Sequence, residues 1–167
     1  PPTRLANARD FIRLSARVRF TSMMDFRDTL RFGLMGDGVT TPASDQLRPT
    51  IIEDDYGYLA TVATGSVGAT ARIAANFAWG ADGSIFGVDQ NIVTETPFSR
   101  MINDNLPHTL SLTVTRSFGD HALIDYSIDG STALRGDDAS TPAFFFKEAG
   151  FGSVPSPGIS YDLDDVL

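Results

Sequence analysis

The sequence predicts an all-β fold of antiparallel strands, and two observations lead to that class. Residues 108–136 read HTLSLTVTRSFGDHALIDYSIDGSTALRG, in which stretches of alternating apolar and polar residues are separated by Gly-Asp and Asp-Gly. Such alternation is typical of antiparallel strands with one buried and one solvent-facing side. The composition agrees, since the chain has 18 Asp and 12 Arg but only 3 Glu and 1 Lys. Asp favours turns whereas Glu favours helices, so few helices are expected.

The same alternation places strands along the rest of the chain. Residues 11–20 put Ile12, Leu14, Ala16, Val18 and Phe20 on one face and Arg13, Ser15, Arg17 and Arg19 on the other. Further strands are expected at 29–35, 56–64, 69–78, 143–151 and 159–167, while 84–107 give no clear pattern. Residues 36–55 are polar with several Gly and Pro, so they are expected to form an exposed loop. Many short strands punctuated by Gly, Pro and Asp predict an antiparallel β-sandwich of the jelly-roll type.

Length, charge and composition limit the functions to consider. A chain of 167 residues is long enough for one domain with its own core, so residues 1–167 are interpreted as a single domain. It begins at Pro1 and ends at Leu167 within an expected strand, which indicates a piece of a longer protein. The net charge of −8 argues against nucleic acid as a partner. No apolar run approaches the ~20 residues of a membrane span, and the absence of Cys excludes a disulfide framework.

Three sequence features are shared with a known superfamily. The first is HTLSLTV at 108–114 followed by DYSIDG at 125–130. The second is GFG at 150–152 followed by a closing strand with DDV at 164–166, and the third is an N-terminal strand at 11–20 that would lie beside that closing strand. In these features the chain resembles the concanavalin A-like lectin/glucanase superfamily, including its laminin-G-like members. As a whole it is similar to domains of exported bacterial proteins of the PEP-CTERM sorting type.

The resemblance implies a jelly-roll sandwich that handles glycans. We therefore expect a non-catalytic recognition domain of an exported bacterial protein, secreted or otherwise extracytoplasmic, that binds a glycan or another surface ligand. A fold does not by itself set a function. A purely structural or assembly module, with neither binding nor turnover, is therefore one alternative.

A glycoside hydrolase or polysaccharide lyase is the other alternative. Catalytic glucanases of the resembled superfamily carry Glu-x-Asp-x-x-Glu on one strand, whereas EDDYGY at 53–58 has Tyr at the last position. Glu53 and Asp55 would share one face of a strand ~6–7 Å apart, which suits an inverting carboxylate pair. A Ser–His–Asp arrangement is excluded, because His121 and Ser127 would lie ~20 Å apart along one strand.

Calcium is the metal that the sequence favours. Jelly rolls of the resembled superfamily often hold one structural ion where the termini meet, and Ca²⁺ takes oxygen ligands from carboxylates. Asp162, Asp164 and Asp165 on the closing strand are the candidate ligands, with Asp10 near the first strand as a possible addition. Ordinary turn-capping Asp residues are the alternative.

Five side chains are candidates for ligand binding. Sugars stack their C–H faces on aromatic rings, and Trp79 and Tyr58 lie near expected loop ends. Arg17, Arg31 and Arg72 lie on the polar faces of expected strands. On adjacent strands these guanidinium groups would bind carboxylated sugars in bidentate fashion. The alternatives are that Trp79 closes one end of the sandwich and that the Arg residues pair with neighbouring Asp.

Overall fold

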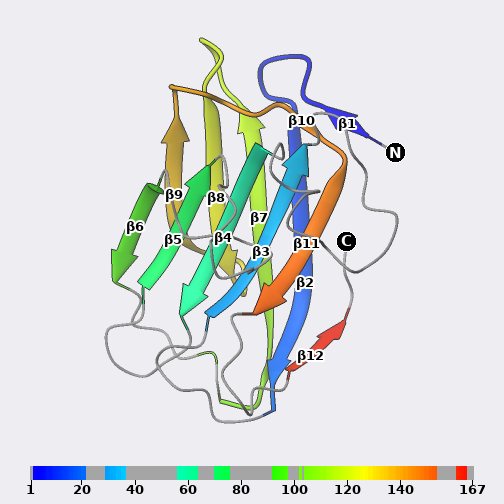
Figure 1. Cartoon of the computed structure of the whole chain (residues 1–167). Helices are drawn as coiled ribbons and strands as arrows, with labels where there is room; N and C mark the ends of the chain where they lie inside the picture. The colour runs from blue at the N-terminus through cyan, green and yellow to red at the C-terminus, as the bar shows by residue number, and fades with distance from the viewer. Residues whose placement is uncertain are drawn as a thin grey trace, which may run out of the picture.

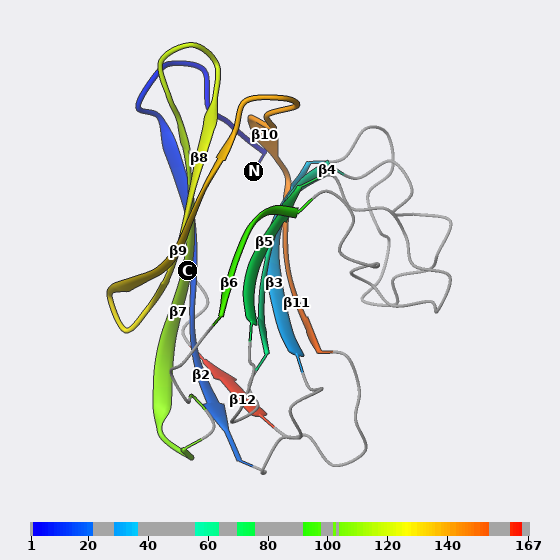
Figure 2. The same cartoon turned by 90° about the vertical axis from the view of Figure 1, so that its left-hand side faces the viewer.

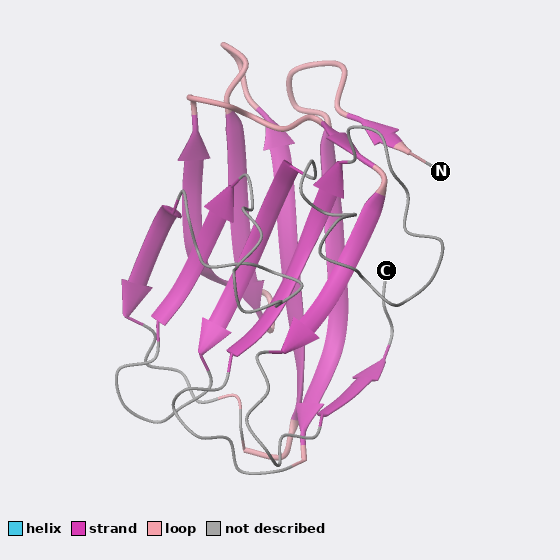
Figure 3. Ribbon diagram, viewed as in Figure 1, coloured by secondary structure: helices cyan, strands magenta, loops and turns pink. Residues whose placement is uncertain are grey.

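The described residues form two five-stranded antiparallel sheets and one two-stranded ribbon (Figure 1). The computed structural model describes residues 2–21, 29–36, 56–63, 70–75, 92–97, 102, 104–153 and 161–164. These residues form strands and loops, and the described part of the chain contains no helix (Figure 3). The prediction of an all-β, antiparallel fold is confirmed.

The two sheets follow a simple order. The front sheet, nearer the viewer in Figure 1, is ordered β11-β3-β4-β5-β6, and the back sheet is ordered β12-β2-β7-β8-β9. The front strands are β3 (Thr29–Gly36), β4 (Tyr56–Ala63), β5 (Thr70–Ala75), β6 (Ile92–Pro97) and β11 (Glu148–Ser153). The back strands are β2 (Phe11–Phe20), β7 (Pro107–Arg116), β8 (Ala122–Ile128), β9 (Ser131–Asp138) and β12 (Tyr161–Asp164). A short ribbon pairs β1 (Thr3–Arg4) with β10 (Phe145–Phe146).

Most expected strands are found, and one is divided. The single strand expected at 143–151 is two strands, because β10 pairs with β1 whereas β11 pairs with β3. The chain changes partner at Lys147, whose amide donates to the Met35 carbonyl at 2.9 Å. β1 carries no alternation and was not expected from the sequence.

The β8–β9 turn shows how local sequence fixes the pairing. Ile128 pairs with Ser131, so only Asp129 and Gly130 lie in the loop. Both have positive φ, at 49° and 77°. That is the type I′ geometry that Asp-Gly favours and that matches the twist of the strands. The Asp-Gly turn expected from the sequence is therefore present.

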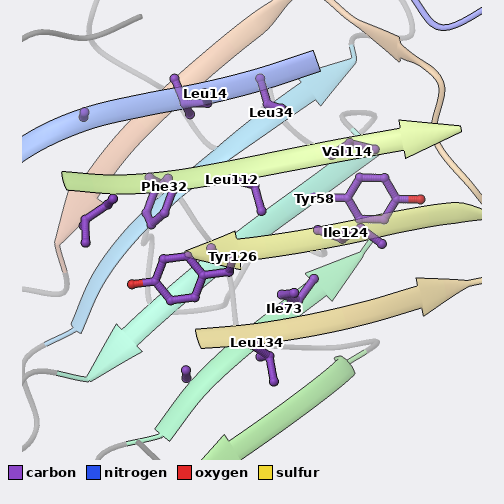
Figure 4. Packing of buried hydrophobic residues seen from close by; sticks show 14 of the residues in the cluster. Leu14, Phe32, Leu34, Tyr58, Ile73, Leu112, Val114, Ile124, Tyr126 and Leu134 are labelled. Carbon is purple, nitrogen blue, oxygen red and sulfur yellow. The ribbon is translucent and has the colours of Figure 1, made fainter. Parts of the chain in front are cut away.

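The sheets face each other as two layers, and their inward side chains form one core (Figure 2). The residues of the core come from alternate positions of each strand. In β8, for example, every second residue is buried. Phe32 of the front sheet packs edge-on against Tyr126 of the back sheet, with ring centroids 5.4 Å apart. Figure 4 shows Tyr58 and Tyr126 within this core, with their hydroxyl groups directed towards opposite ends. Burial of side chains of this size stabilises a fold by about 1.5–3 kcal/mol each.

The sheets approach closely where β6 faces β9. Gly136 lies on the inward face of β9, opposite Ile124 of β8. A Cβ at Gly136 would lie 2.8 Å from Val93 Cγ1 and 3.1 Å from Thr94 Cγ2, both on β6. The missing side chain therefore permits this close approach.

Candidate functional site

Two of the predicted arginines share a row on the outward side of the front sheet. The register places Arg31 of β3 opposite Thr61 of β4, and Thr61 opposite Arg72 of β5. Glu95 of β6 ends this row opposite Arg72. Neighbouring strands lie ~4.8 Å apart, so the backbones at Arg31 and Arg72 are roughly 10 Å apart. We call Arg31, Thr61, Arg72 and Glu95 the front row.

The centre of the front row is sheltered from solvent. Thr61 is only 3% exposed although it points away from the core, and Leu59 on the same face is 1% exposed. Among the described residues the Thr61 hydroxyl has no hydrogen-bond partner. Arg31 beside it is half-buried. The register thus places a buried hydroxyl between two arginine positions on neighbouring strands.

Arg17 lies on the other side of the molecule. It is exposed on the outward face of β2 in the back sheet, between Thr109 of β7 and Asp164 of β12. The core separates it from Arg31 and Arg72. The structure thus brings together two of the three predicted arginines, and these two lie on one sheet.

The predicted calcium ligands lie opposite arginines. In the register of β12 and β2, Asp164 stands opposite Arg17 and Asp162 stands opposite Arg19, so an acidic residue meets a basic residue at each position. Asp165 lies outside the described residues. Asp10 is seven residues from Arg17 along the chain, a separation of ~23 Å, which places it far from β12.

Asp10 has a local role instead. Its carboxylate accepts hydrogen bonds from the Asn7 amide at 2.7 Å and from the Asn7 side chain at 3.3 Å. No group of three or more His, Asp or Glu side chains arranged to hold a metal ion occurs within the described ranges. The turn-capping alternative thus describes Asp10.

Tyr58 is a core side chain. It is fully buried on the inward face of β4, and its hydroxyl donates to Asp138 Oδ2 at 3.0 Å and accepts from the Ala143 amide at 2.9 Å. Burial raises the pKa of Tyr58. The hydroxyl is therefore fully used inside the protein. Trp79, Glu53 and Asp55 lie outside the described residues.

Asp138 completes this buried contact. Its Oδ1 accepts hydrogen bonds from the Ser140 amide and hydroxyl and from the Thr141 amide, at 3.0–3.1 Å. Burial alone would raise the pKa of Asp138, but the hydrogen bonds from Thr141, Tyr58 and Ser140 bring it below its usual value. The carboxylate thus ties the end of β9 to β4 of the opposite sheet.

A charged cluster around His108 was not predicted from the sequence. His108 points inward from β7, and its Nδ1 lies 2.9 Å from Asp129 while its Nε2 lies 2.9 Å from Asp104. Burial lowers the pKa of His108, but the hydrogen bonds to Asp129 and Asp104 outweigh it and raise the pKa above its usual value. Since both ring nitrogens are hydrogen-bonded, this histidine is a structural clamp rather than a general base. The signal available in the sequence was its parity with the inward residues Leu110 and Leu112.

No protein-family model and no curated protein matches this chain. In the part of the chain that the structure describes, no helix has the length and apolar character needed to cross a membrane.

Proposed function

We propose that this chain is a non-catalytic recognition domain of an exported bacterial protein, with a jelly-roll sandwich of the concanavalin A-like type. The strand order supports this fold, because β2 near the start of the chain pairs with β12 near its end. The sequence motifs that resemble the superfamily support the same proposal. The ligand we propose is a glycan with carboxylate groups, bound at the front row.

The single observation that carries the proposal is the alignment of Arg31, Thr61 and Arg72 across three neighbouring strands. Guanidinium groups bind carboxylates through two parallel hydrogen bonds. A buried hydroxyl without a partner is costly, so a ligand oxygen that reached Thr61 would gain free energy. Trp79 remains a candidate for stacking on a sugar ring, whereas Tyr58 in the core is not part of this proposal.

A glycan array with neutral and acidic sugars tests the proposal. We expect binding to acidic glycans that is lost in Arg31→Gln and in Arg72→Gln. Arg135→Gln is the matched control, because Arg135 is exposed on the back sheet and pairs with Asp125. An array that is blank for the unchanged protein would overturn recognition and favour the structural module. Loss of binding in Arg17→Gln but not in Arg31→Gln would move the ligand to the back sheet.

The calcium expectation is tested in the same array. Binding that disappears with a chelator would support an ion held by Asp162, Asp164 and Asp165. Equal binding with Ca²⁺ and with chelator would favour Arg17 and Arg19 as the partners of Asp164 and Asp162.

A further inference from the structure

One arginine at the end of the back sheet has an unusual backbone. Arg9 has φ 76°, in the left-handed region that residues other than Gly, Asn and Asp seldom adopt. Its amide donates to the Arg116 carbonyl at 2.7 Å, and the Arg116 amide donates to the Asp10 carbonyl at 2.9 Å. These bonds hold the N-terminal loop against the β7–β8 turn (Figures 1 and 2). Such strain in a folded protein is often associated with function.

The side chain of Arg9 lies over an exposed aromatic ring. Its guanidinium carbon is 5.3 Å from the centroid of Phe118, which is 70% exposed in the β7–β8 turn. Phe11, two residues along the chain, is 61% exposed on the outward face of β2. This end of the molecule thus presents a cation and two large apolar rings to solvent.

The neighbouring acids do not neutralise Arg9. No ion pair joins Arg9 to an acid among the described residues. Asp10 is hydrogen-bonded to Asn7, and Asp120 is paired with Arg116. The positive charge of Arg9 is therefore available to a ligand.

Arg116, and not the side chain of Arg9, supplies the side-chain hydrogen bonds between these loops. Its guanidinium donates to the carbonyls of Leu5 and Ala6 at 2.9 and 3.0 Å, pairs with Asp120, and lies 4.6 Å from the ring centroid of Phe144. Arg116 therefore links the N-terminal loop, the β7–β8 turn and the segment before β10. Among the described residues, the guanidinium of Arg9 makes no such hydrogen bonds.

We propose that Arg9, Phe118 and Phe11 form a second binding site, for a hexuronate residue of an acidic polysaccharide. The carboxylate of such a sugar fits the forked guanidinium donors of Arg9, and its C–H face fits an exposed aromatic ring. The net charge of −8 opposes non-specific binding of polyanions, so binding requires a local site of this kind. This site rests on the ligand class of the proposed function but not on the front row.

The test is titration with an oligogalacturonate, followed by calorimetry and by amide NMR shifts. The fully methyl-esterified oligomer is the ligand control, because it has the same rings without charge. We expect binding that shifts the amides of Arg9 and Gly119 and that the ester lacks. Removing a charged hydrogen-bond donor weakens binding by about tenfold or more, and we expect this for Arg9→Gln and, through loss of the ring, for Phe118→Ala. Arg135→Gln should bind as the unchanged protein does.

Arg9→Gly separates function from backbone strain. Glycine adopts φ 76° without penalty, so this variant should be at least as stable to urea as the unchanged protein, yet should lose binding. Full binding by Arg9→Gly, or equal binding of the acid and its ester, would overturn the proposal. Arg31→Gln and Arg72→Gln distinguish the two sites, since a front-row ligand is lost in those variants without any change at the amides of Arg9 and Gly119.

Discussion

At the scale of single residues, the two core tyrosines differ in how their hydroxyl groups are satisfied. Tyr58 donates to Asp138 and accepts from the Ala143 amide, whereas the buried hydroxyl of Tyr126 has no partner among the described residues. Both rings are fully buried on inward faces. The same substitution should therefore have opposite consequences at the two positions.

We expect Tyr58→Phe to lower the free energy of unfolding by about 1–3 kcal/mol, because Asp138 Oδ2 and the buried Ala143 amide both lose their hydrogen bond to the hydroxyl. Tyr126→Phe should be neutral or stabilising, since it removes a hydroxyl that has no hydrogen bond to lose. Urea unfolding of both variants beside the unchanged protein measures this difference. Equal destabilisation by the two substitutions would contradict it.

The His108 clamp makes stability depend on pH. The pKa of His108 is raised in the folded protein, so its contribution is fully present below the unfolded pKa of about 6.5 and is lost as pH rises through the folded pKa. The pKa of Asp104 is lowered by its hydrogen bonds to His108 and to the Leu106 amide, so its contribution is lost as pH falls through that lowered value.

We expect the difference in unfolding free energy between the unchanged protein and His108→Gln to be largest in mildly acidic solution and to decline towards alkaline pH. Urea titrations across this range measure it. A difference that grows with rising pH would show that the histidine is neutral when clamped. His121→Gln is the control, because His121 is only half-buried and its Nδ1 lies 3.3 Å from Asp137 Oδ1.

At the scale of elements, the contact between β6 and β9 depends on a missing side chain. We expect Gly136→Ala to destabilise the fold by about 1–3 kcal/mol, as overpacking commonly does, because the new Cβ would lie 2.8 Å from Val93 Cγ1. The added Val93→Ala should recover part of that loss by making room. A double-mutant cycle from urea unfolding measures the coupling. Additive effects would mean that the two strands do not meet as described.

The sequence predicts where strands lie better than it predicts which strands pair with one another. Strand β2 was expected at residues 11–20 and spans Phe11–Phe20. The prediction succeeded because a strand with one buried face shows alternating apolar and polar residues in the sequence itself. Pairing depends on contacts between distant segments, so nothing local placed Arg17 and Arg31 on different sheets. The division at Lys147 was missed for the same reason, since the residues before Lys147 pair with β1 and those after it pair with β3.

The candidate sites show the same limit at finer detail. Arg31 and Arg72 were candidates because the alternation of residues shows which face of a strand is polar. That they lie in one row depends on how the strands pair, which the sequence does not show. Arg9 was not a candidate, because a left-handed φ at arginine has no sequence signal. Tyr58 was placed near a loop end by the chain pattern, whereas β4 begins at Tyr56 and directs Tyr58 into the core.

At the scale of the whole molecule, both sheets contribute to one core, so they should unfold together. We expect a single urea transition in which far-UV circular dichroism and the loss of core methyl NMR signals coincide. Two separated transitions would show that the sheets are independent units. Leu112→Ala in the back sheet should shift the whole transition, with a loss of about 2–5 kcal/mol, and not only the signals from its own sheet.

The pairing of β12 with β2 has a mechanical consequence. Tyr161 lies opposite Phe20 and Asp164 lies opposite Arg17, so the strands run antiparallel over four residue pairs. Strand β2 is held in place by its pairing with β7. A pulling force applied to β12 at Asp164 would therefore break the residue pairs one after another, beginning with Asp164 and Arg17. If the force instead acted along the strand axis, all the hydrogen bonds of the strand would have to break at the same time. The last strand should therefore yield at low force while the remaining nine strands of the two sheets keep their pairing.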